Sequence, residues 1–320
     1  MATELSRILL ERQYLFKLLK FTFSMKHSPV MTIILLVSFL LAQFFGLLVI
    51  YNYIDTEQTA LMGKTTFKEL PIGERPPMEE KISFLPVIIA VLIGTALLFV
   101  IIRYQLMLVW KGWFLLAVVL SLFVAFNAFV PVKIAFFVAL FLGLWKIFKP
   151  NFVVQNLTEI MLYGGLAAIF VPMFNLWSVV ILLILISLYD AYAVWKSKHM
   201  IVLAQAQAKA KMFAGLLIPY KWGKLSDQKM KSTGEIKVPQ KKVRTAILGG
   251  GDLGFPLIFA GVVMKELGLW SSLVIPFFAA LGLGVLLLIS KEKKFYPAMP
   301  FISAGCFLGL GLIFLFRLFF

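Results

Sequence analysis

The sequence is poor in charged residues, and this scarcity excludes a water-soluble fold. Charged residues make up 14% of the 320 residues, whereas hydrophobic residues make up 61%. An average globular domain contains about 25% charged residues. A soluble protein of this length could not bury so much apolar surface, so lipid surrounds most of the chain.

Cysteine and histidine are nearly absent, which excludes a disulfide-linked protein and a protein with a Cys/His metal site. The single cysteine, Cys306, allows no internal disulfide, and His27 and His199 provide no plausible Cys/His metal site. We therefore expect no disulfide framework, no metal and no cofactor.

The charge that is present is mostly positive and unevenly placed. Lys and Arg number 31 and Asp and Glu 15, which gives a formal net charge of +16. Twelve of the basic residues lie between Lys196 and Arg244, and five precede residue 28. Basic blocks beside apolar runs are typical of the cytoplasmic loops of membrane proteins. We therefore expect a lipid bilayer, and not nucleic acid, as the partner of these charges.

Apolar runs predict an all-α, polytopic membrane protein with nine transmembrane helices. A helix needs about 20 residues to cross the hydrocarbon of a bilayer. The first run is too long for the core of a signal peptide and has no small-residue cleavage site nearby. The predicted spans are about 30–54, 84–102, 114–130, 132–148, 153–174, 176–195, 246–264, 270–289 and 297–316.

The connecting loops predict the orientation in a cell membrane. If the N-terminus is inside, the even-numbered connections face the cytoplasm, and these carry most of the loop Lys and Arg, including the block 196–244. The first connection, 55–83, has four basic and six acidic residues, a net charge of −2. We therefore predict a cytoplasmic N-terminus and an external C-terminus.

This topology divides the chain into four segments. Residues 1–28 form a basic cytoplasmic N-terminal segment, and 29–195 hold helices one to six with the external loop 55–83. Residues 196–245 form a basic cytoplasmic loop, in which 201–220 is predicted to be an interfacial helix because Lys209 and Lys211 interrupt its apolar run. Residues 246–320 hold helices seven to nine.

Two carboxylates, Asp190 and Asp252, lie well inside predicted spans. An aspartate near the centre of a bilayer costs about 2.5–3.5 kcal/mol on insertion scales, so it indicates a function. Asp190 lies six residues before Lys196 and Asp252 eight residues after Arg244. At about 1.5 Å per residue, both acids are roughly 9–12 Å from the cytoplasmic surface. Consecutive helices can therefore bring them side by side.

Two adjacent carboxylates without a neighbouring cation are expected to share a proton, because both cannot ionise at close range. One acid then acts as a general base for water, and the other polarises a carbonyl, which is the chemistry of aspartic peptide hydrolysis. A single intramembrane aspartate can instead be a structural hydrogen-bonding group or part of an ion path. Two acids at one depth on sequential helices favour catalysis over that alternative.

Three short motifs resemble those of the GxGD intramembrane aspartyl proteases, the presenilin and signal peptide peptidase group. They are Tyr189-Asp190 in the sixth span, Gly249-Gly250-Gly251-Asp252 in the seventh, and Pro297-Ala298-Met299-Pro300 at the start of the ninth. Each is weak alone, but their order and the nine-span layout extend the resemblance over nearly the whole chain. It is strongest to the compact archaeal presenilin homologues, and Met299 replaces the usual Leu. The resemblance implies a presenilin-like fold with Asp190 and Asp252 as the catalytic pair.

The other motif residues are candidates for binding substrate or supporting the active site. Gly249, Gly250 and Gly251 remove every Cβ before the acid and would let a substrate backbone approach, although small residues also serve close helix packing. Pro297, beside Ala298 and Met299, prevents a regular helical start and is expected to leave backbone carbonyls unpaired, or it simply marks the end of a span. Tyr189 could donate a hydrogen bond near the acids or merely pack.

The sequence therefore predicts an intramembrane aspartic endopeptidase that cleaves within transmembrane segments of other proteins. Its expected partners are those substrate helices and the bilayer, and its oligomeric state and any accessory subunits stay open. One alternative is a prepilin-type peptidase, which also uses Gly-x-Gly-Asp but is expected to have fewer spans. The other is an ion channel or transporter that uses the two aspartates as an ion relay.

Overall fold

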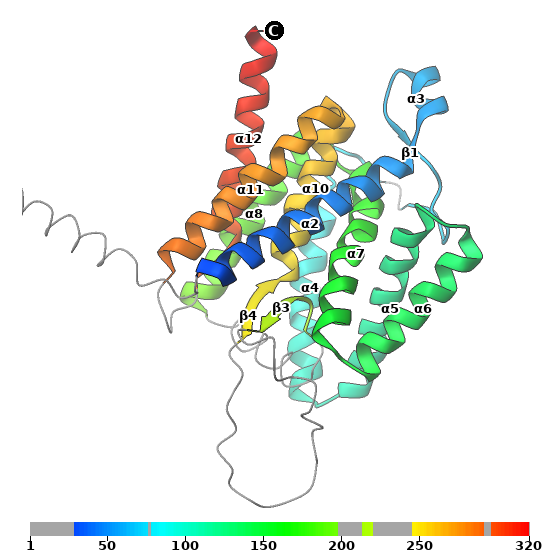
Figure 1. Cartoon of the computed structure of the whole chain (residues 1–320), viewed down its shortest axis with the longest axis vertical. Helices are drawn as coiled ribbons and strands as arrows, with labels where there is room; N and C mark the ends of the chain where they lie inside the picture. The colour runs from blue at the N-terminus through cyan, green and yellow to red at the C-terminus, as the bar shows by residue number, and fades with distance from the viewer. Residues whose placement is uncertain (1–28, 76–77, 198–212, 220–244, 291–295, 320) are drawn as a thin grey trace, which may run out of the picture.

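The computed structural model describes residues 29–75, 78–197, 213–219, 245–290 and 296–319 (Figure 1). Over these residues the chain is mostly helical, and seven helices are long and apolar enough to cross a membrane. The predicted N-terminal segment 1–28 and most of the predicted cytoplasmic loop lie outside the described residues.

The long helices agree with the predicted apolar runs to within a few residues at most ends. The largest difference is at α5, which begins seven residues before the predicted span and includes Lys111. The helices are α2 (Pro29–Tyr53), α4 (Phe84–Arg103), α5 (Met107–Asn127), α6 (Val132–Phe148), α7 (Phe152–Phe170), α8 (Leu176–Ala191), α10 (Gly250–Leu267), α11 (Leu269–Ile289) and α12 (Met299–Phe319). The shorter helical elements are α3 (Thr56–Met62), the 3₁₀ turn η1 (Val171–Met173) and the π-helical turn η2 (Tyr192–Lys196).

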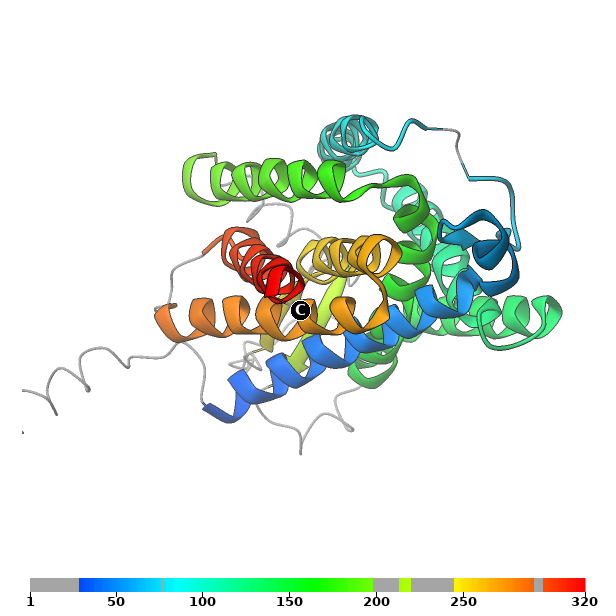
Figure 2. The same ribbon diagram turned by 90° about the horizontal axis from the view of Figure 1, so that it is seen from above.

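Helix α10 lies at the centre of the bundle and is packed by α2, α7, α8, α11 and α12 (Figures 1 and 2). Its middle is apolar on every side, and Leu257, Phe259 and Val262 are fully buried. A helix that is hydrophobic all round requires neighbours on all faces. Helices α5 and α6 lie outside α7, and α4 lies at the edge of the bundle against α8 and α5. Asp190 in α8 and Asp252 in α10 therefore lie on two helices that pack directly against each other.

Polar contacts join alternate helix ends on one side of the bundle. The Tyr53 hydroxyl at the end of α2 donates to the Val124 carbonyl of α5 at 2.9 Å. Lys265, near the end of α10, donates to the Phe174 carbonyl after α7 and pairs with Glu80 before α4, both at 2.9 Å. These contacts cap free carbonyls at helix ends, which otherwise lack intrahelical partners. The end of α6 and the start of α7 lie on the opposite side of the bundle. We call this side the strand end.

The strand end takes its name from two strands that the sequence prediction missed. Strand β3 (Gly215–Pro219) pairs in antiparallel register with β4 (Thr245–Gly249), with Leu217 opposite Ile247. The prediction of an interfacial helix over 201–220 is therefore wrong for 215–219, and residues 198–212 lie outside the described residues. The seventh span likewise starts with a strand, and its helix begins at Gly250. Short apolar runs of this kind fit either a strand or a helix, and only tertiary contacts decide between them.

A second, smaller pair of strands lies in the loop predicted to be external. Strands β1 (Ile54–Asp55) and β2 (Thr66–Phe67) pair antiparallel on either side of α3. The Asp55 side chain accepts a hydrogen bond from the Gln58 N–H at 3.0 Å and so caps α3. The loop is thus partly ordered by its own polar groups.

Candidate active site

Asp190 is placed at the end of α8, where the regular helix gives way to the π-helical turn η2. Its side chain is only 5% exposed, and its Oδ2 accepts a hydrogen bond from the Met299 backbone N–H at 3.0 Å. The neighbouring Ala298 backbone N–H also lies near this carboxylate. Both N–H groups come from the start of α12, so an acid of one helix caps the N-terminus of another.

The proline motif explains why this cap must come from outside. Pro297 and Pro300 have no backbone N–H, so Ala298 and Met299 between them carry the donors of this turn. The Ala298 carbonyl accepts N–H groups from the first turn of α12, at 3.2 Å from Phe301 and 3.1 Å from Ile302. The Ala298 carbonyl is therefore paired, and the expectation that the prolines leave other carbonyls unpaired stays a prediction. The groups of this turn that lack intrahelical partners are its N–H donors.

Asp252 is the third residue of α10 and follows directly from strand β4. The backbone N–H of Gly249, the residue that caps the helix, lies near its carboxylate. An acidic side chain at this position reaches back to the cap residue in the same way as the acid of a capping box. The positive end of the α10 dipole also favours a negative charge here. Each of the two acids thus has backbone donors at a helix N-terminus.

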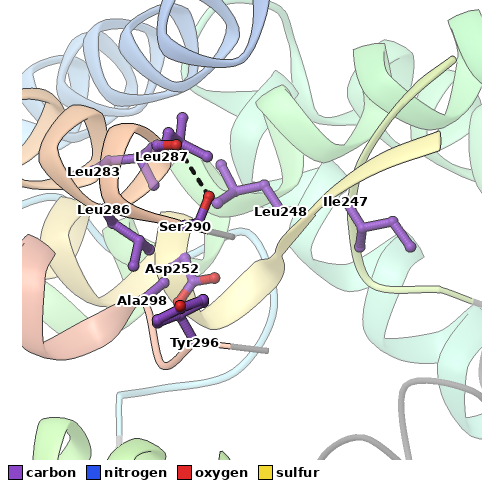
Figure 3. Close-up of a pocket in the computed structure, with 9 residues that line it drawn as sticks. All are labelled: Ile247, Leu248, Asp252, Leu283, Leu286, Leu287, Ser290, Tyr296 and Ala298. Atoms are coloured by element: carbon purple, nitrogen blue, oxygen red, sulfur yellow. Dashed lines mark hydrogen bonds between the residues drawn. The ribbon is translucent and has the colours of Figure 1, made fainter. Parts of the chain in front are cut away.

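The two acids lie on neighbouring helices of the bundle. Helices α8, α10 and α12 pack against one another, and the carboxylates of Asp190 and Asp252 are close enough to interact electrostatically. Asp252 also lines a pocket of about 120 Å³, together with Ala298 and Tyr296 (Figure 3). The other lining residues are Ile247 and Leu248 of β4, and Leu283, Leu286, Leu287 and Ser290 of α11 and its end. A pocket of this size has room for water next to Asp252.

The three glycines before Asp252 have different surroundings. A Cβ on Gly249 would lie 3.1 Å from Oδ2 of Asp252, so this glycine leaves space for the carboxylate. A Cβ on Gly250 would collide with the Tyr163 hydroxyl of α7. Gly251 is exposed, and a Cβ there would meet only the Phe255 ring, at 3.5 Å. Gly251 is therefore the position where another chain can approach, whereas Gly250 is required for packing.

Tyr189 is linked to α4 by its hydroxyl. Its oxygen lies 3.1 Å from Oγ1 of Thr95, a residue in the middle of α4. Since α4 has few other contacts with the bundle, this hydrogen bond connects the neighbour of Asp190 to the least packed helix. A role for Tyr189 at the acids stays a prediction.

Several buried polar residues near the site were not singled out by the sequence. Lys146 of α6 forms an ion pair with Glu159 of α7, and both side chains are at least 97% buried. Gln155 and Asn156, one turn earlier in α7, bond the backbone of β3. The available signal was the spacing of Gln155, Glu159 and Tyr163, which places three polar groups on one face of a membrane helix.

The described residues thus combine a helical bundle, two carboxylates on packed helices and a small pocket lined by Asp252. The family model described as signal-peptide peptidase, presenilin aspartyl protease matches residues 56–318. The chain belongs to this family. No curated protein sequence matches it.

Two solved structures have the same fold. Both are described as a presenilin family intramembrane aspartate protease, in the C222 and P2 space groups. The first has a TM-score of 0.58 and 18% sequence identity over 88% of this chain and 97% of that one. The second has a TM-score of 0.56 and 18% identity over 87% and 95%. The resemblance found in the motifs is thereby confirmed at the level of family and fold.

We predict that Gly250→Ala destabilises the protein more than Gly251→Ala. The added methyl group at position 250 collides with Tyr163, which is buried and cannot move aside, and overpacking of this kind costs about 1–3 kcal/mol. The methyl group at 251 makes an ordinary contact. Thermal unfolding in detergent measures the difference, and equal midpoints for the two variants would contradict the packing of Tyr163 on Gly250.

Proposed function

We propose that this protein is an intramembrane aspartic endopeptidase that hydrolyses peptide bonds in transmembrane segments of other proteins. The observation that supports the proposal is the position of Asp190 and Asp252 on packed helices within electrostatic range, with Asp252 lining a pocket that has room for water. Membership of a family of aspartyl proteases supports it and favours it over a prepilin-type peptidase.

The mechanism follows from the competition between two acids in one site. Both carboxylates cannot ionise at close range, so the pair holds one proton. The ionised member accepts a proton from a water molecule as its oxygen attacks the scissile carbonyl carbon. The protonated member donates a hydrogen bond to the carbonyl oxygen, and a proton then passes to the departing amine nitrogen as the C–N bond breaks. Because the acids titrate as one unit, neither role belongs to a single residue. The chemistry requires no cofactor.

The substrate must present an extended backbone to these acids. A peptide carbonyl inside a helix is already hydrogen-bonded and shielded from attack, and in lipid its release is costly. We therefore infer that suitable substrates are single transmembrane segments with helix-weakening residues near the depth of Asp252. The exposed Gly251, with Gly249 beside the carboxylate, provides the backbone surface that such a segment would approach. Pro297, Ala298 and Met299 support the site through Asp190, Tyr189 through its hydroxyl contact with α4, and Gly250 through packing.

Replacement of either acid is predicted to abolish cleavage. In Asp190→Ala and Asp252→Ala the dyad is lost as a unit, so we expect a rate reduction of about a thousandfold or more. The measurement is cleavage of a single-span reporter by purified protein in detergent, with cleavage sites mapped by mass spectrometry. Asp55→Asn, which changes a carboxylate in the loop before α3, is the control and should cleave normally.

Full activity in either aspartate variant would end the proposal. Ion flux in liposomes that depends on both acids, without any proteolysis, would instead favour the ion-relay alternative.

The backbone donor of Met299 gives a second prediction. Proline is well accommodated in the first turn of a helix, so Met299→Pro removes the N–H that bonds Asp190 while it preserves the helix. A hydrogen bond to a charged group contributes about 1.5–3 kcal/mol, so we expect the cleavage rate to fall about tenfold to a hundredfold. Met299→Leu retains the N–H and nearly the same volume, and it should retain activity. A fully active Met299→Pro protein would show that this donor does not serve the reaction.

For the membrane topology we propose nine spans, with the N-terminus and the strand end at the cytoplasmic side. Besides the seven apolar helices, this scheme counts two more helices as spans. They are α6, which has 17 residues, and α10, which carries Asp252, Lys265 and Glu266. Contacts that join alternate helix ends on one side support an up-and-down arrangement. The four segments are those expected from the sequence, with the cytoplasmic loop 196–245 now including β3.

Reporters fused to the two termini test the orientation. A reporter at the N-terminus is expected to be cytoplasmic and one after Phe320 external, because the basic residues flanking the spans stay inside. A cytoplasmic reporter at both ends would rule out an odd number of spans, and exchanged positions would rule out the proposed direction.

A further inference from the structure

The first turns of α7 carry an amide side chain that binds strand β3 from outside the sheet. Nε2 of Gln155 lies 2.8 Å from the Phe213 carbonyl oxygen and 3.1 Å from that of Gly215. Gln155 is buried, so both carbonyls are satisfied by it in a place that water does not easily reach.

Asn156, the next residue of α7, binds the same edge of the strand with both ends of its amide. Its Nδ2 donates to the Leu217 carbonyl at 2.9 Å, and its Oδ1 accepts the Leu217 N–H at 2.8 Å. This is the pattern that a neighbouring strand would offer to Leu217. The two amides together therefore replace a third strand along the outer edge of β3, and we call them the amide clamp.

The amide clamp is itself held by a buried ion pair. Oε1 of Glu159 accepts a hydrogen bond from Gln155 at 3.0 Å, one helical turn away, and the same oxygen pairs with Nζ of Lys146. Lys146 belongs to α6 and is 3% exposed, whereas Glu159 is 1% exposed. Both charges are therefore out of contact with solvent. An ion pair in such a place fixes the geometry of its partners more than it adds stability.

Strand β3 in turn contacts the residues just before Asp252, the turn Gly249–Asp252. Gly215 lies opposite Gly249, and its φ of +138° suits glycine, as a Cβ there would also strike the Leu248 carbonyl. The Gly250 N–H donates to the Ala214 carbonyl at 3.1 Å. Thus Gly249 lies opposite the first residue of β3 and Gly250 bonds the residue before β3, three and two residues ahead of Asp252.

Tyr163 gives α7 a second contact with the same turn. Its hydroxyl occupies the space where Gly250 would carry a side chain, and its ring packs beside Gly254. It also interacts with the Glu159 carboxylate one turn earlier. One face of α7 thus reaches the turn before Asp252 both through β3 and directly.

We propose that Gln155 and Asn156, held by the Lys146–Glu159 pair, are positioning residues that fix strand β3 and, through it, the placement of Asp252. This inference rests on the proposed function, because it assigns a catalytic consequence to a restraint on Asp252. None of the four residues touches the pocket, so they act through the turn Gly249–Asp252 and not on the substrate.

The test compares two amide deletions at opposite ends of the bundle. Gln155→Met keeps the size of the side chain but removes its donors, and Asn127→Leu removes the amide that bonds Tyr53 at 3.3 Å on the far side. Since a displacement of about 1 Å can cost a hundredfold in rate, we expect Gln155→Met to lower kcat by about tenfold to a hundredfold. KM for the reporter should stay within about twofold, as in a loss restricted to the transition state. Asn127→Leu should leave kcat unchanged even if it melts earlier.

Amide hydrogen exchange of full-length protein in detergent gives a readout that does not need activity. Peptides covering β3 and the start of α10 should exchange faster in Gln155→Met than in wild type, and at the wild-type rate in Asn127→Leu. Asn156 is only half-buried, so Asn156→Leu serves as the gentler variant if Gln155→Met fails to fold. It is expected to change exchange and kcat in the same directions.

The outcomes separate this inference from the proposed function. Unchanged exchange, or faster exchange with unchanged kcat, overturns the positioning role while the protease proposal stands. A KM effect without a kcat effect also overturns it, because the clamp would then serve substrate binding. If wild type cleaves nothing, or Asp252→Ala stays active, the proposed function fails. The exchange data then decide alone whether the clamp holds the turn before Asp252.

Discussion

The whole site depends on how two carboxylates are tolerated inside a membrane bundle. Each costs several kcal/mol to place there, and no lipid group can repay that cost. Backbone N–H groups that helix starts leave free offset part of that cost: Met299 bonds Asp190, and the N–H groups of Ala298 and Gly249 lie near Asp190 and Asp252. The helix starts are therefore part of the site, and the glycine and proline motifs mark where they occur.

The sequence predicted those features that depend on composition and on local residue patterns. Acids inside apolar runs identified Asp190 and Asp252, and the lengths of those runs located the helices. The strands β3 and β4 could not be predicted, because apolar runs of five residues fit helix and strand equally. The side chains that settle the matter, Gln155 and Asn156, lie about 60 residues away in the chain. The proline motif was located at the start of α12 as expected, but the N–H donors of Ala298 and Met299, which lack intrahelical partners, were not anticipated.

The same limit applies to Lys146 and Glu159. Each falls near the end of an apolar run, where charges usually face water, and only the packing of α6 on α7 shows that both are buried. This buried pair holds Gln155, which in turn bonds the chain at the start of β3, next to the start of α10. A flexible connection there would leave Asp252 free to move with its strand, and Asp190 on the neighbouring helix would have no fixed partner.

The closed edge of β3 has a consequence for the sheet as a whole. A two-stranded ribbon normally exposes two rows of hydrogen-bonding groups and invites unlimited growth by edge-to-edge association. Here one row is occupied by amide side chains of α7, and the register directs the N–H and C=O of Ile247 to the other row, on β4. Among the described residues, the outer edge of β4 is therefore the edge left for pairing with another strand, and it runs directly into the turn that carries Asp252.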